Sequence, residues 1–242
     1  MNDIALTLAL HFALFAAVCI VLRFFGRQIS WKPLLGGLAC IAAYWVVSIA
    51  GRFLQTALPF SASLHWNWGG KLCAIIVALA VLFLSPTLSP KQVGLTWRQR
   101  SGSIWPALFM MIAMCALDWI DASVSSVKVN LSSERLLFQA IMPGLDEELV
   151  FRGLVLTFFV RAFGEGPVLA GARFGVAEVM VTLLFAAAHG LHVSQNTLAV
   201  DWHVLAITGA LGAGLMWLRR RTDSLVLPVI AHNLVNFGES FF

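Results

Sequence analysis

The sequence has little charge for its length. Only 12% of its 242 residues are Asp, Glu, Lys or Arg, and 60% are hydrophobic, with a mean hydropathy of +0.86. Soluble domains carry about 25% charged residues, so this composition excludes an ordinary soluble protein. It predicts an all-α fold, a polytopic bundle of transmembrane helices. The net charge of +4 comes from Lys and Arg in the loops, which bears on membrane topology and not on nucleic acid.

The sequence also lacks paired cysteines. Cys19, Cys40, Cys73 and Cys115 stand singly in apolar runs and form no CxxC motif. This spacing argues against a disulfide framework and against a thiolate metal site. Residues 1–3 contain no Lys or Arg, so the first apolar stretch lacks the basic region of a cleavable signal and is predicted to be a retained span. No repeat or long linker divides the chain, and we expect a single integral membrane domain over residues 1–242.

Long apolar runs dominate what remains. About eight membrane helices are predicted, several of them near the minimum spanning length of about 17 residues. Their approximate ranges are 4–22, 34–50, 71–86, 103–120, 134–161, 175–191, 203–218 and 223–240. The segment 52–70, which contains Trp66 and Trp68, is expected at the membrane interface.

Basic residues favour one orientation of these spans. With the N-terminus outside, eleven of the sixteen Lys and Arg fall in cytoplasmic loops, and Arg52, Lys71, Lys128 and Arg135 fall in or beside outer ones. Cytoplasmic loops are enriched in Lys and Arg. The sequence therefore predicts a multi-pass protein of the bacterial inner (cell) membrane with both termini outside.

The stretch Asp146-Glu147-Glu148-Leu149-Val150-Phe151-Arg152-Gly153 concentrates charge in an apolar span. A charged side chain at the bilayer centre costs roughly 2.5–3.5 kcal/mol and usually serves a function. Glu148 and Arg152 are four residues apart, the favourable spacing for an ion pair on a helix. Glu147 points to another face, so we expect it to be free for chemistry, with Pro143 and Gly144 loosening the helix upstream. The alternative is a buried ion pair beside a solvated acid.

Two later spans carry polar residues at helical spacing. Phe185 and His189 are four residues apart, as are His232 and Asn236. A lone histidine in a helix is more often a hydrogen-bonded core residue than a catalyst. However, lipid offers these side chains no partner, so convergence with Glu147 in the bundle interior is the natural arrangement. A carboxylate, two imidazoles and an amide suit hydrolysis.

In this order the three patterns resemble the CPBP intramembrane proteases, the family of CAAX proteases and bacteriocin-processing enzymes also called Abi. The family pattern EExxxR, FxxxH and HxxxN appears as Glu147-Glu148-x-x-x-Arg152, Phe185-x-x-x-His189 and His232-x-x-x-Asn236. The resemblance covers about residues 136–240. It implies eight membrane helices around a proteolytic site, and we assign the catalytic core to residues 134–240.

The resemblance also implies roles for these residues. Glu147 would activate the hydrolytic water, His189 and His232 would hold it and move protons, and Asn236 would stabilise the oxyanion. Glu148, Arg152 and Phe185 would support the site. Glu147, His189 and His232 could instead form a His₂Glu set for Zn²⁺. The sequence contains no HExxH motif, and a glutamate-activated water without an obligatory metal is favoured.

The predicted topology places these residues in the outer half of the bilayer. A protein or peptide substrate with a membrane-embedded segment or a C-terminal sorting tail then fits better than a prenylated cytosolic tail. Two other function classes stay open. A non-catalytic scaffold or immunity protein would tolerate Glu147→Ala, and a proton-coupled transporter would show substrate flux and usually inverted repeats, which the sequence does not show.

Overall fold

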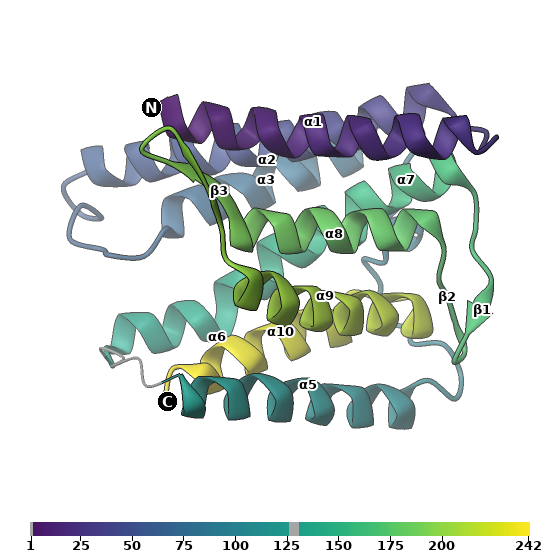
Figure 1. Cartoon of the computed structure of the whole chain (residues 1–242). Helices are drawn as coiled ribbons and strands as arrows, with labels where there is room; N and C mark the ends of the chain where they lie inside the picture. Colours follow the sequence, from purple (N-terminus) through teal and green to yellow (C-terminus); the bar gives the residue numbers. More distant parts are fainter. Residues whose placement is uncertain (1, 126–130) are drawn as a thin grey trace.

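The computed structural model describes residues 2–125 and 131–242, and Lys128 from the topology argument lies outside the described residues. The described chain is an all-α membrane-type bundle, as the composition predicts (Figure 1). Its helices are α1 (Asn2–Phe24), α2 (Trp31–Ala57), α3 (Trp68–Leu84), α4 (Pro90–Val93), α5 (Ile104–Val124), α6 (Ser133–Glu147), η1 (Glu148–Val155), α7 (Leu156–Phe163), α8 (Val176–Gly190), α9 (Trp202–Thr222) and α10 (Val226–Glu239).

The longer helices have the length and the surface of membrane spans. Among the described residues, α1, α2 and α5 are long and apolar enough to cross a bilayer, and α3 and α8 are shorter apolar helices. Their outer faces expose large apolar side chains, such as Ile76, Phe109 and Ile112. Exposed apolar surface of this extent marks contact with lipid. The predicted spans match these helices, except that α2 continues to Ala57 into the segment expected at the interface.

The predicted fifth span is one helical rod made of α6, η1 and α7. Pro143 lies inside α6 without ending it. Immediately after Glu147 the rod widens into the π-helix η1, whose eight residues are all buried. Short π-helical segments often mark functional sites. The loosening expected near Pro143 and Gly144 therefore lies just downstream of them, where the charged stretch begins.

Small residues bring α2 and α3 close to this rod. A Cβ atom on Gly51 of α2 would lie 2.7 Å from the Cα atom of Gly70 of α3, so only glycine fits at this crossing. The approach carries Tyr44 and Lys71 towards Asp146 at the end of α6. Close packing through small residues is how membrane helices approach one another.

Two short hairpins connect helices at opposite ends of the bundle. Strands β1 (Val168–Leu169) and β2 (Ala172–Arg173) pair in the loop after α7, and β3 (Leu191–Ser194) pairs with β4 (Thr197–Val200) after α8. Both chain termini lie at the end with the β3–β4 hairpin (Figure 1). Neither hairpin is predicted by the sequence patterns.

Candidate active site

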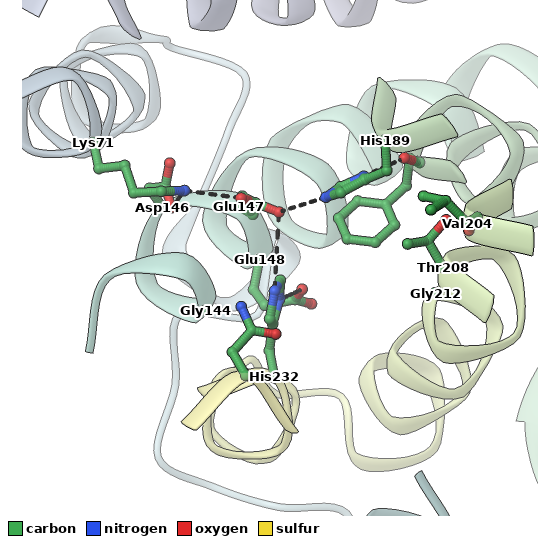
Figure 2. A network of polar contacts seen from close by, with 12 residues as sticks. Lys71, Gly144, Asp146, Glu147, Glu148, His189, Val204, Thr208, Gly212 and His232 are labelled. Carbon is green, nitrogen blue, oxygen red and sulfur yellow. Dashed lines mark hydrogen bonds and ion pairs between the residues drawn. The ribbon is translucent and has the colours of Figure 1, made fainter. Parts of the chain in front are cut away.

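Glu147 lies at the junction of α6 and η1, where its two carboxylate oxygens face different partners. Oε1 accepts a hydrogen bond from Lys71 Nζ at 2.8 Å. Oε2 is buried without a hydrogen-bond partner among the described residues. It lies 3.9 Å from Nε2 of His189 and 3.9 Å from Nε2 of His232 (Figure 2). The structure therefore brings together the carboxylate and both imidazoles that the sequence singled out.

The expectation that Glu147 is unpaired is wrong for one of its oxygens. Lys71 of α3 bridges Glu147 and Asp146, with Nζ also 2.8 Å from Asp146 Oδ1 (Figure 2). Asp146 is fully buried, and the Tyr44 hydroxyl donates a hydrogen bond to its Oδ2 at 3.1 Å. Two adjacent buried carboxylates need a cation to offset their lost hydration.

Lys71, Asp146 and Tyr44 are site residues that the sequence patterns did not predict. Lys71 was expected only as a charge beside an outer loop. The available signal was that Lys71 begins an apolar span, where an ionisable side chain usually has a functional partner.

Glu148 pairs with Arg152, as the four-residue spacing between them predicts. Arg152 Nη1 donates to Glu148 Oε1 at 2.9 Å, and both side chains are fully buried. The same oxygen lies 2.8 Å from His232 Nδ1. Because a carboxylate oxygen accepts, Nδ1 of His232 carries the proton, which leaves Nε2 to face Glu147. Arg152 also donates to the Gly212 carbonyl at 3.2 Å and thereby joins α9 to the site.

His189 is oriented in the same way from α8. Its Nδ1 lies 2.7 Å from the Phe185 carbonyl oxygen, which can only accept, so the proton is on Nδ1 and Nε2 is again directed to Glu147. The Phe185 ring packs between the two imidazoles, with centroids 4.6 Å from His189 and 6.0 Å from His232. The Arg152 guanidinium lies 4.0 Å over the same ring. Phe185 therefore fixes three of the polar side chains at once.

The spacing of these three groups suits a water molecule. A water about 2.8 Å from Glu147 Oε2 and from each Nε2 would see neighbouring partners at about 90°. Zinc ligands lie about 2.0–2.2 Å from the metal in a tetrahedron, and 3.9 Å separations would open the angle to about 135°. No group of three His, Cys, Asp or Glu in the described part of the chain is arranged to hold a metal ion. The residues as placed therefore do not fit a zinc set.

Asn236 lines the same cavity as Glu147, and its amide is hydrogen-bonded to another side chain. A cavity of about 310 Å³ is lined by Glu147, His189, His232 and Asn236, together with residues of α5 and α9. Asn236 Nδ2 donates to Gln139 Oε1 at 3.4 Å. The neighbouring Asn233 instead ties α10 to α6, since its Oδ1 accepts the Gly144 N–H at 2.8 Å.

Comparison with known proteins supports what this geometry indicates. Residues 131–238 match the family described as type II CAAX prenyl endopeptidase Rce1-like. The chain matches no curated protein and no solved structure. The matched residues include all three motifs, from Glu147 to Asn236, and confirm the resemblance that those motifs carry. The C-terminal part of the chain is thus similar to the Rce1-like family of CAAX-type proteases.

Proposed function

We propose that the protein is an intramembrane endopeptidase that uses Glu147 to activate water. The observation that carries this proposal is the unpartnered Glu147 Oε2, which lies 3.9 Å from the Nε2 atoms of both His189 and His232. The three atoms converge on a cavity large enough for an extended segment of peptide. Glu147 lies on the rod made of α6, η1 and α7, and His189 and His232 lie on α8 and α10. Helices, and not loops, therefore hold all three side chains in place.

The chemistry follows from the protonation of each group. The water gives one hydrogen bond to Glu147 Oε2 and one to an imidazole Nε2, and its oxygen attacks the peptide carbonyl. Glu147 takes the proton as the C–O bond forms. The Asn236 amide, turned from Gln139, donates to the oxyanion. When the C–N bond breaks, the proton passes to the leaving nitrogen from Glu147 or from a histidine.

The variant Glu147→Gln tests this assignment. Glutamine keeps the size of the side chain but cannot accept the proton of the water, so we expect cleavage to be lost while the protein stays folded. The measurement is cleavage of membrane-anchored reporter peptides by purified protein, with thermal unfolding in parallel. Glu165→Gln, an exposed acid that pairs with Arg220, is the matched control and should cleave normally. Cleavage retained by Glu147→Gln would remove the assigned role.

Chelation separates a glutamate-activated water from a metal-bound one. Under the proposal, EDTA or 1,10-phenanthroline leaves the rate of cleavage unchanged, because Glu147 activates the water without a metal ion. Loss of cleavage on chelation, with recovery on adding Zn²⁺, would assign Glu147, His189 and His232 to a metal instead.

For the substrate we propose a membrane-associated protein with a C-terminal tail segment, cleaved on the side of the membrane that holds both chain termini. The cavity lining supports this choice, because Asp121, His203 and Glu239 lie at the helix ends on the terminus side. A bacterial cell membrane with the termini outside is part of the same proposal. The proposed catalytic core is residues 134–240 within one domain.

A further inference from the structure

The cavity that holds the candidate catalytic groups has an acidic part. Beyond Glu147, three carboxylates line it, namely Asp118 and Asp121 of α5 and Glu239 at the end of α10. No Lys or Arg is among the described residues that line this cavity. The remaining walls between these acids and the histidines are mostly apolar, including Ile207, Leu211 and Leu215 of α9.

Two of these three carboxylates, Asp118 and Glu239, have no ion-pair partner among the described residues. Asp121 Oδ1 lies 2.8 Å from His203 Nε2. Asp118 is only 9% exposed, and its buried Oδ2 has no hydrogen-bond partner among the described residues. The Glu239 carboxylate also has no ion pair among the described residues. A buried charge without a partner is costly, so a cation that enters the cavity gains an interaction that the free protein lacks.

We propose that this acidic part of the cavity is a subsite for a Lys or Arg side chain of the substrate, close to the scissile bond. The inference rests on the proposed function, since it names the class of peptide that the same site accepts. A long basic side chain fits such a place, because its methylene stem packs on apolar walls while its head reaches the acids. Asp118 is the proposed main contact, because it is the most buried of the three and its Oδ2 has no hydrogen-bond partner in the described part of the chain.

Binding can be tested without cleavage. The full chain carrying Glu147→Gln, in detergent, is titrated with labelled synthetic peptides made of an apolar helix and a polar tail. The peptides differ only in carrying Arg, Gln or Glu at one position of the tail, and each position of the tail is tested in turn. We expect one or two positions at which Arg binds about tenfold more tightly than Gln, and Glu binds more weakly than both.

Variants locate the preference. Adding Asp118→Asn should remove most of the Arg over Gln preference while the Gln peptide binds as before, and Glu239→Lys should shift the preference towards Glu. Asp3→Asn is the matched control. Asp3 is an acid at the same end of the bundle, and its carboxylate accepts hydrogen bonds from the β3–β4 turn, but it does not line the cavity. It should leave the preference unchanged.

Two failures are distinguishable in this design. Equal or absent binding of the Arg peptides, or a preference that survives Asp118→Asn, overturns the acidic subsite. Wild-type protein that binds Arg peptides selectively but cleaves none of the series overturns the protease and leaves the subsite standing.

Discussion

At the scale of single residues, the site depends on how a few cations are shared among adjacent acids. Lys71 serves Asp146 and Glu147, while Arg152 and His232 both bind Glu148. Each of these contacts is largely buried, so a lost partner leaves an uncompensated charge. The charged groups should therefore affect stability and cleavage in different proportions.

Removing Lys71 should impair both properties. Lys71→Met leaves two adjacent buried carboxylates without their cation, which should destabilise the protein by about 3–5 kcal/mol. Displacement of Glu147 should also lower kcat, by about a hundredfold. The measurements are thermal unfolding in detergent and steady-state cleavage.

A second change separates the two roles of Lys71. Lys71→Met with Asp146→Asn removes one charge of each sign and should recover part of the stability, while kcat stays low because Glu147 still lacks its partner. The single variant Lys71→Arg keeps a cation beside Glu147 and should retain most of the wild-type kcat. Full kcat in the double variant of Lys71→Met and Asp146→Asn would show that Lys71 does not position Glu147.

Glu148 should behave as a structural acid. Glu148→Gln weakens the partner of buried Arg152 and should destabilise the protein by about 3–5 kcal/mol. Residual cleavage is expected, because Glu147 remains in place. Unfolding midpoints compared with those of Glu147→Gln test this difference, and equal midpoints with complete loss of cleavage would contradict it.

At the scale of elements, the π-helix η1 and the contact between α6 and α10 position the charged stretch. A Cβ atom on Gly144 would lie 2.6 Å from the Val229 carbonyl oxygen and 2.8 Å from Asn233 Oδ1. Backbone cannot move aside as a flexible side chain can. Glycine at this position therefore sets how closely α10, with His232, approaches the end of α6.

Gly144→Ala should push these helices apart. We expect loss of the hydrogen bond from Gly144 N–H to Asn233, a cost of about 1–3 kcal/mol in stability, and slower cleavage. Gly209→Ala is the matched control, since its Cβ would meet only Ala186 Cβ at 3.8 Å. That change should be neutral or slightly stabilising. Unfolding and cleavage of the two variants give the answer, and equal behaviour would contradict the packing argument.

Local sequence patterns predicted the elements and part of the site. Apolar run length gave the helices, and the four-residue spacing of Glu148 and Arg152 gave their ion pair. The partner of Glu147 could not be found in this way, because Lys71 lies 76 positions away and no local pattern links them. The π-helix was also missed, since its register depends on packing against neighbouring helices and not on periodicity. The role of Asn236 stays a prediction.

At the scale of the whole molecule, charge is divided between the two ends of the bundle. Lys91, Arg98, Arg161 and Arg219 line a cavity of about 970 Å³ at the end with the β1–β2 hairpin. The opposite end carries both termini and the β3–β4 hairpin (Figure 1). Because basic ends face the cytoplasm, this division supports the proposal that the termini are outside.

Reporter fusions test the orientation. Alkaline phosphatase fused after Phe242 should be active, and the same enzyme fused after Arg221 should be inactive, because the first reporter is exported and the second is not. A green fluorescent protein series at the same sites should give the reverse pattern. An active phosphatase after Arg221 would overturn the outward-facing site.

Three neighbouring acids, Asp146, Glu147 and Glu148, each face a different set of partners on helices α2, α3, α8 and α10. Deleting or inserting one residue between Pro143 and Arg152 would rotate each carboxylate into its neighbour's surroundings, even if every motif residue were kept. The number of residues in this segment is thus as much a part of the candidate site as their identity, whereas helices α5 and α9 can change their cavity-facing side chains one at a time.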